Sequence, residues 1–349
     1  MSLRALSLAA FLAAFATFIL LPAHADDRKL FPAEAAIPNS RIIHFTSAID
    51  KEPYTIQISI PFKPAPKSGY PVMYVLDGEL YFPEAAVAAN WLGDKGAVVV
   101  GIGHDALNDK TVIARYARRN PENGKPLDGL AAINAFQTMR NYDFGWPVKS
   151  EHRAPAFVEK DIGPETGDVD AFLQVIEKEI KPKVEALIPV DRSNQALFGH
   201  SLGGLAVVRA LFTEPTAFRT FIPASPSLWY DGGTVLASEK QFAEAVTARR
   251  IAPRVLVTVG AREPDNLAPT KDDLVKFTPA QRAEIAPYGT MLGTWPGMIT
   301  GARELAARLK ALHGKPGYTV DYQLIADQNH PSSAYVAIIR AIPFAFPEK

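Results

Sequence analysis

Short apolar or β-branched runs recur along the chain and predict strands. They cover residues 54–60, 72–76, 97–102, 195–198, 220–222, 255–259 and 318–325. Several of these runs are apolar throughout, as expected for parallel strands that are buried on both faces. The run 54–60 instead alternates isoleucine with polar residues, which predicts an edge strand with one face in water.

Helical patterns lie between these runs. The clearest covers residues 169–188, where apolar residues recur on one face and Pro182 predicts a kink; two others cover 204–212 and 302–312. Because strands and helices alternate, we expect an α/β fold with a doubly wound, mainly parallel sheet. Segments 104–167 and 264–301 break this alternation, and we interpret them as loop insertions that form a lid or bind substrate.

The first residues have the pattern of a secretory signal peptide. Arg4 precedes an apolar stretch, residues 5–21, and Ala23-His24-Ala25 supplies the small residues of a cleavage site. We expect cleavage after Ala25, which makes the protein periplasmic or secreted. The alternative is an uncleaved membrane anchor, since the stretch is nearly long enough to span a bilayer. Residues 26–349 are expected to form a single catalytic domain.

Composition narrows the classes of partner. The 349 residues include 37 basic and 37 acidic residues and no cysteine. A balanced charge argues against nucleic acid as a partner, and a chain without cysteine has neither disulfides nor thiolate metal ligands. We expect a small-molecule partner, no cofactor, no metal, no membrane span in the mature chain, and a monomer.

The most specific motif is Gly199-His200-Ser201-Leu202-Gly203, which follows an apolar run and precedes a helical one. This G-x-S-x-G pattern predicts a nucleophile elbow, a turn from strand to helix that strains the backbone of the serine. Side chains at positions 199 and 203 are expected to collide with neighbouring elements, and His200 to pack beneath the turn. The alternative is a glycine-rich turn whose serine only caps the helix.

A serine nucleophile needs a base and an orienting carboxylate, and on this fold the chain order is serine, acid, histidine. Among the histidines only His313 and His330 follow Ser201. His313 ends a predicted helix, where the helix dipole stabilises a charged imidazole, so we assign the base to His330 in the polar loop after the last strand. Glu263 is the preferred acid, and Asp265 is the alternative.

The oxyanion of an acyl-transfer reaction needs two backbone N–H donors. Leu202, directly after the serine, is the first expected donor. The turn Asp77-Gly78-Glu79 follows a predicted strand, and we expect the N–H of Glu79 to be the second donor, with Gly78 allowing the close approach. An ordinary turn is the alternative.

Six short stretches carry a family resemblance: Tyr70–Gly78 (YPVMYVLDG), Ile180-Lys181-Pro182, Leu197–Leu205 (LFGHSLGGL), Ser225–Tyr230 (SPSLWY), Val259–Glu263 (VGARE) and the loop around His330. Together they resemble the putative-esterase family of α/β hydrolases, which includes the siderophore trilactone esterases of bacteria. The resemblance implies an α/β-hydrolase fold and a serine, a histidine and a carboxylate at the position of Glu263. Segments 120–165 and 265–301 are longer than the family leads us to expect and border the site, which leaves room for a different substrate.

Two further groups of residues are candidates for substrate binding. Arg115, with Arg118 and Arg119, is suited to an acidic or catecholate substrate, and a solvated face is the alternative. Trp229 and Tyr230 are predicted to line the pocket, and a core position is the alternative for both.

We interpret the chain as a serine esterase that forms an acyl-enzyme and acts on a siderophore-like lactone or another small ester. An acyltransferase on the same scaffold and a catalytically silent binding protein are the alternatives. A burst that depends on an acceptor favours the transferase, and the absence of turnover from an intact fold favours the binding protein.

Overall fold

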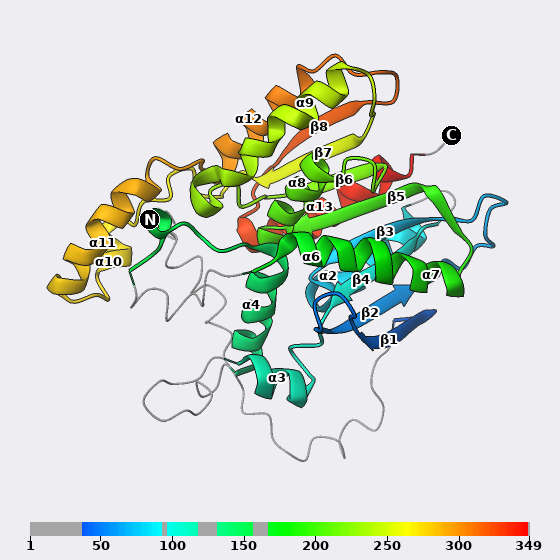
Figure 1. The fold of residues 1–349 in the computed structure, drawn as a ribbon, viewed down its shortest axis with the longest axis horizontal. Helices are drawn as coiled ribbons and strands as arrows, with labels where there is room; N and C mark the ends of the chain where they lie inside the picture. The colour runs from blue at the N-terminus through cyan, green and yellow to red at the C-terminus, as the bar shows by residue number, and fades with distance from the viewer. Residues whose placement is uncertain (1–36, 93–95, 118–130, 156–166, 348–349) are drawn as a thin grey trace.

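A mainly parallel sheet forms the centre of the structure, a computed structural model that describes residues 37–92, 96–117, 131–155 and 167–347. Within these residues the sheet has eight strands in the order β1-β2-β4-β3-β5-β6-β7-β8 (Figure 1). The strands are β1 (Ser40–Thr46), β2 (Pro53–Ser59), β3 (Tyr70–Leu76), β4 (Val98–Gly103), β5 (Val190–His200), β6 (Thr220–Ala224), β7 (Arg254–Gly260) and β8 (Thr319–Ile325). β2 pairs antiparallel with both β1 and β4, and every other pair is parallel.

Helices connect the strands and cover both faces of the sheet. They are α2 (Gly78–Trp91), α3 (Lys110–Tyr116), α4 (Ala131–Phe144), η2 (Ser150–His152), α6 (Val169–Val175), η3 (Ile176–Ile180), α7 (Lys181–Leu187), α8 (Leu202–Thr213), η4 (Tyr230–Ser238), α9 (Glu239–Thr247), α10 (Lys271–Leu274), α11 (Pro279–Leu292), α12 (Met298–Lys310) and α13 (His330–Ala345). None of the helices in the described ranges is both long enough and apolar enough to cross a bilayer.

The two faces of the sheet bury different sets of side chains. On β3, Val72 and Tyr74 join one apolar core with residues of α6, α8, α9 and α12, whereas Met73 and Val75 join a second core with residues of α2 and α13. Successive side chains of a strand point to opposite faces, so a strand covered on both sides is apolar throughout. The predicted α/β class with a doubly wound sheet is therefore confirmed.

The strand predicted at the edge of the sheet is not an edge strand. β1 lies outside β2, which is paired on its other side with β4. The alternation within β2 is real, because Tyr54, Ile56 and Ile58 are buried. β1 was not predicted, because all of its side chains are half-buried or exposed, Ile42 by 57%. A strand at the edge needs little apolar surface.

The two segments predicted as loops contain helices. Segment 104–167 includes α3 and α4, and segment 264–301 includes α10, α11 and the start of α12. Some of the polar residues that suggested loops are N-caps of these helices. Asp109 caps α3, and Thr270 and Thr278 form capping boxes at α10 and α11. Their role as a lid stays a prediction.

The long helix predicted over 169–188 changes its hydrogen-bonding pattern shortly before Pro182, where the kink was predicted. Five residues of π-helix, Ile176–Ile180, interrupt the long helix directly before α7. Pro182 lies in the first turn of α7, where a residue without a backbone N–H is tolerated.

The carboxyl ends of β3, β5, β6 and β7 meet at one edge of the sheet, because these strands run parallel. The residues that directly follow them are Asp77, Ser201, Ser225 and Ala261. An open α/β sheet binds its ligands at this edge.

Candidate active site

Ser201 occupies a strained turn between β5 and α8. Its backbone has φ 61° and ψ −118°, a region that costs a residue other than glycine about 1–3 kcal/mol. The Ser201 N–H donates to the carbonyl of Ala224 at 3.0 Å, which ties the turn to the end of β6. The tight strand-to-helix turn predicted from the motif is present.

Two glycines beside the serine are required by close contacts with the backbone. A Cβ at Gly199 would lie 2.3 Å from the carbonyl oxygen of Gly203, and a Cβ at Gly204 would lie 2.8 Å from that of Ala224. At Gly203 the nearest contact of a Cβ would be 3.4 Å, which is ordinary packing. The expected collision is therefore right for position 199 and wrong for 203. Gly204 has the second close contact because the first turn of α8 packs directly against the end of β6.

The side chain of Ser201 is not used to cap α8. It makes no hydrogen bond to the first N–H groups of the helix. Its Oγ lies 3.4 Å from the Oγ of Ser227, whose backbone N–H donates to the Ser201 carbonyl at 3.1 Å. The alternative of a purely capping serine does not describe this geometry, and Ser227 is a neighbour that sequence reasoning missed.

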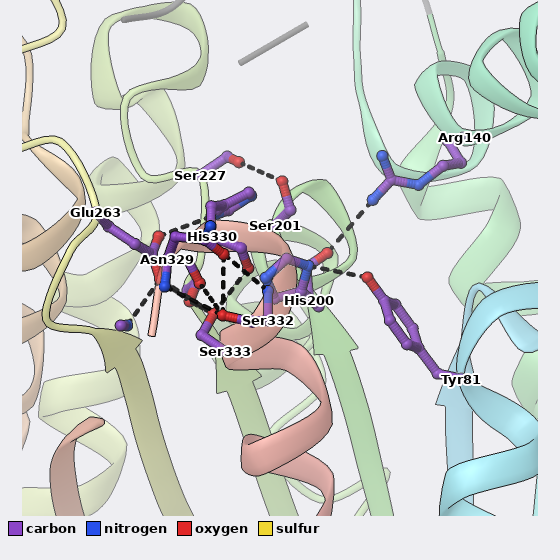
Figure 2. Close-up of polar contacts among 12 residues, drawn as sticks. Tyr81, Arg140, His200, Ser201, Ser227, Glu263, Asn329, His330, Ser332 and Ser333 are labelled. Atoms are coloured by element: carbon purple, nitrogen blue, oxygen red, sulfur yellow. Dashed lines mark hydrogen bonds and ion pairs between the residues drawn. The ribbon is translucent and has the colours of Figure 1, made fainter. Parts of the chain in front are cut away.

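A buried pair of a carboxylate and an imidazole lies beside this turn (Figure 2). His330 Nδ1 donates to Glu263 Oε2 at 2.6 Å, with the Glu263 side chain fully buried and that of His330 11% exposed. His330 begins α13, and its ring lies against the ring of His200, with centroids 4.4 Å apart and the ring planes tilted by 41°. Since His200 directly precedes Ser201, the structure brings the predicted serine, histidine and glutamate to one place.

Three donors surround the other oxygen of Glu263. The N–H of Gly260 lies 2.7 Å, the Oγ of Ser225 2.6 Å and the Oγ of Ser333 3.1 Å from Oε1. Burial alone raises the pKa of the Glu263 carboxyl, but the hydrogen bond and charge of His330, with the bonds from Ser225 and Gly260, hold the pKa below its ordinary value. Glu263 is therefore a carboxylate at neutral pH, with an Nδ1 proton directed at it.

The alternative residues for the acid and the base lie elsewhere. Asp265 binds the start of α12: its two oxygens accept the backbone N–H of Thr300 at 2.6 Å and the Thr300 hydroxyl at 2.5 Å. His313 is exposed beyond the end of α12. The structure places Glu263, and not Asp265, against the imidazole.

His200 is buried beneath the turn, as its sequence position suggested. Its Nδ1 lies 3.1 Å from the hydroxyl of Tyr81, and the two rings meet edge to face. Burial, together with the charges of His330 and Arg140, holds the pKa of His200 well below its ordinary value. The His200 ring, which lies against the ring of His330, is therefore neutral.

The predicted oxyanion donors stand at the starts of two helices. Leu202 begins α8, and Gly78 begins α2 after Asp77, whose backbone is left-handed at φ 54° and ψ 51°. A Cβ at Gly203 would lie 3.4 Å from an Asp77 carboxylate oxygen, so the two helix starts are neighbours. Both present N–H groups that helix geometry leaves unpaired.

The Glu79 side chain forms hydrogen bonds that the sequence did not suggest. Its buried carboxylate accepts the backbone N–H of His104 at 2.7 Å and also interacts with its own backbone N–H. The interaction of the carboxylate with its own backbone N–H competes with the role of that N–H as an oxyanion donor. That role, like the role of Gly78, stays a prediction.

Two buried ion pairs fasten α4 to the ends of β3 and β4. Arg140 Nε and Nη2 lie 2.6 and 3.0 Å from the two carboxylate oxygens of Asp77, and Nη2 also lies 3.4 Å from the carbonyl of His200. One turn later on α4, Asp143 pairs with His104 Nε2 at 2.7 Å. Sequence reasoning missed both pairs because it did not predict α4. The available signal was the spacing of three between Arg140 and Asp143.

Comparisons with known proteins agree on one family. A family model described as "Putative esterase" matches residues 145–286. The ferri-bacillibactin esterase BesA of Bacillus subtilis is 27% identical over 316 residues, which cover 88% of this chain and 90% of that protein. The siderophore triacetylfusarinine C esterase of Aspergillus fumigatus is 30% identical over 246 residues, 66% of this chain and 71% of that protein. The chain belongs to this esterase family.

Solved structures agree with this assignment. The BES protein from Bacillus cereus is 26% identical, with a TM-score of 0.64 over 90% of this chain and 97% of that one. The siderophore hydrolase EstB from Aspergillus nidulans, at 22% identity and a TM-score of 0.61 over 90% and 98% of the two chains, shares the fold. The α/β-hydrolase type of fold is confirmed, and the family supports a hydrolase.

The predicted aromatic residues of this esterase differ in position. Tyr230 is only 6% exposed and donates its hydroxyl to the carbonyl of Trp146 at 2.8 Å, with the two rings edge to face. It therefore fits the core alternative. Trp229 is half-buried, and its indole N–H is buried without a hydrogen-bond partner in the part of the chain that the structure describes. Its role at a pocket stays a prediction.

The structure does not bring Arg115 to the site. Its side chain is 55% exposed and lies 3.5 Å from Glu52, in the turn between β1 and β2. β2 is three strand positions away from β5, which carries the serine turn. Substrate binding by Arg115 was predicted from a cluster of positive charge and stays a prediction; in the structure the arginine forms a surface ion pair. Arg118 and Arg119 lie outside the described residues.

The glycine contacts give a matched pair of variants. We expect Gly204→Ala to lower the free energy of unfolding by about 1–3 kcal/mol, because its Cβ overlaps the backbone at the end of β6. Gly203→Ala should stay within about 1 kcal/mol of the parent, since alanine is the better helix former and has room. Chemical denaturation of the two variants measures the difference, and equal losses would contradict the account of the turn.

Proposed function

We propose that this protein hydrolyses carboxylic esters through a covalent acyl-enzyme, with Ser201 as nucleophile, His330 as base and Glu263 as the acid that orients the base. The observation that carries the proposal is the fully buried Glu263 carboxylate, 2.6 Å from His330 Nδ1, beside a serine held in a strained turn. A buried charge needs partners to offset its desolvation. Here one of those partners is an imidazole, the side chain that most often acts as a general base near neutral pH.

The reaction proceeds in two halves. Ser201 Oγ attacks the ester carbonyl carbon while His330 Nε2 takes the hydroxyl proton; the tetrahedral intermediate then breaks its bond to the alkoxy oxygen, and His330 returns the proton to the departing alcohol. Water attacks the acyl-enzyme by the same route, which releases the carboxylic acid and restores the serine. The Glu263 carboxylate accepts the hydrogen bond from Nδ1–H throughout. The proton therefore stays on Nδ1, and Nε2 carries the lone pair at the start of each half.

Charge on the carbonyl oxygen needs donors that are already in place. The N–H of Leu202 at the start of α8 and the N–H groups of Gly78 and Glu79 at the start of α2 are proposed for this role. The helix dipoles of α8 and α2 favour negative charge at the same point.

The relatives guide the choice of substrate and compartment. Proteins named as esterases of bacillibactin and of triacetylfusarinine C match most of this chain, and we propose a siderophore-like ester or lactone as the substrate. The apolar stretch 5–21 and Ala23-His24-Ala25 support a cleaved signal peptide and a periplasmic or secreted enzyme. That segment lies outside the described residues.

The first prediction concerns the nucleophile. Ser201→Ala should lower the turnover of a siderophore trilactone and of an activated aryl ester by roughly four to six orders of magnitude, as in other serine triads. Circular dichroism should show an unchanged fold. Ser193→Ala, in the exposed first part of β5, is the matched control and should keep full activity. Labelling of the wild type by a fluorophosphonate at a serine other than 201 would refute the assignment.

The second prediction separates the two candidate acids. Glu263→Gln should lose a large share of kcat, about a hundredfold or more, because a neutral amide no longer fixes the tautomer or stabilises the imidazolium. Asp265→Asn should keep kcat within about threefold, since Asp265 binds the start of α12. Both variants are measured on one activated ester. An active Glu263→Gln beside an inactive Asp265→Asn would move the role to Asp265.

A further inference from the structure

His104 is a buried histidine with an acceptor at each ring nitrogen. It follows β4 directly and is 4% exposed. Its Nδ1 lies 2.5 Å from the carbonyl oxygen of Pro53, and its Nε2 lies 2.7 Å from the carboxylate of Asp143. A carbonyl and a carboxylate only accept, whereas a neutral imidazole has one N–H. With Asp143 ionised, both contacts are hydrogen bonds only when the ring carries two protons, so this pair is an imidazolium and a carboxylate.

Acidic groups from three elements face this ring. Asp143 comes from α4, Glu79 from α2, and Glu52 from the turn between β1 and β2. The ring of Tyr54 on β2 lies against His104, with centroids 4.5 Å apart. Burial alone would lower the pKa of His104, but the charge and hydrogen bond of Asp143, then Glu79 and the Pro53 carbonyl, raise it to about 9.

Further charged groups complete the surroundings of His104. Asp50 accepts the hydroxyl of Tyr54 at 2.7 Å, and Arg115 pairs with Glu52 at 3.5 Å. Asp109 and the exposed His44 line the cavity of about 410 Å³ above the ring of His104. The acidic side chains outnumber the basic ones, so the surroundings favour a positive charge on His104.

His104 contributes to the contacts at both ends of the turn that starts α2. On one side the His104 backbone N–H donates to Glu79, at 2.7 Å. On the other side Asp143 holds His104, and Arg140, three residues earlier on α4, holds both carboxylate oxygens of Asp77. Asp77 and Glu79 flank Gly78, so an ion pair at Asp77 and a hydrogen bond to Glu79 fix the turn from its two ends.

We propose that His104 is a positioning residue for ester hydrolysis: as a buried imidazolium it locks α4 and Glu79, and thereby holds the turn 77–79 where the developing oxyanion needs its backbone donors. This proposal rests on the proposed function. His104 does not contact the substrate in this account. It acts through Asp143 and Glu79, and loss of its second proton releases the Asp143 or the Pro53 contact.

The test compares kcat, KM and their pH dependence in three proteins. On an ester that is stable in alkali, and with active sites counted by fluorophosphonate incorporation, His104→Gln should lower kcat about ten- to a hundredfold and change KM by less than about threefold. Wild-type kcat should fall above about pH 9 as His104 loses its proton, and that alkaline fall should be absent from His104→Gln. His44→Gln, at an exposed histidine on β1, is the matched control and should behave as the wild type.

Asp143→Asn provides the conservative variant. Its amide oxygen still accepts from Nε2, but the charge that favours the imidazolium is gone, so the alkaline fall in kcat should move to lower pH. An alkaline limb that stays in place in Asp143→Asn, or a His104→Gln enzyme with wild-type kcat, would overturn the proposal.

A folding measurement separates failure of this proposal from failure of the proposed function. A histidine whose pKa is raised by folding stabilises the protein fully below about pH 6.5, and that stability is lost as the pH rises through about 9. The thermal midpoint of the wild type should therefore drop over this range by more than that of His104→Gln. A wild type that shows this difference but hydrolyses no ester would refute only the proposed function. An identical pH dependence of the thermal midpoint in the two proteins would refute the claim that His104 is an imidazolium.

Discussion

The candidate site depends on one buried negative charge. The carboxylate of Glu263 is removed from water and held by donors that follow β6, end β7 and form the first turn of α13. Removing one donor from a buried acceptor costs about 1–3 kcal/mol, and more when the acceptor is charged, because no solvent compensates for the lost hydrogen bond. The charge therefore fixes the relative positions of these three elements, and His330 is held in one orientation as a consequence.

A second set of charges supports the neighbouring strands. Asp77 and His104 follow β3 and β4, and both are paired with α4, a helix of the first insertion. Two arrangements of buried charge thus meet at the same edge of the sheet, one that orients the base and one that fixes the turn beside the serine. The strained backbone of Ser201 lies between them, tied to β6 through the Ala224 carbonyl. Strain of this kind persists only where the surroundings determine the conformation.

The parts of this arrangement that follow local rules were readable from the sequence. The strand-turn-helix around Ser201 depends on glycines within a few residues. Chain order left two histidines, of which His330 lies in the polar loop after the last strand, and the position after a strand together with the family resemblance favoured Glu263. Ser225 and Ser333 were not found, because their contacts with Glu263 join residues 38 and 70 positions apart. β1 was missed because an exposed edge strand needs no apolar pattern, and α4 because the segment 104–167 around it is rich in Pro, Asn, Gly and charge. The pairing of Arg115 with Glu52 was not found, because it joins residues far apart in the sequence.

The central claim is a covalent bond between Ser201 and the acyl group of an ester. The most direct measurement is to mix the enzyme with an activated ester, quench with acid at short times, and determine the intact mass and the modified peptide. The account predicts one acyl group per chain, located on Ser201, which appears in a burst and decays at the rate of product release. An enzyme that turns the ester over without an adduct, or with an adduct on another residue, would contradict it.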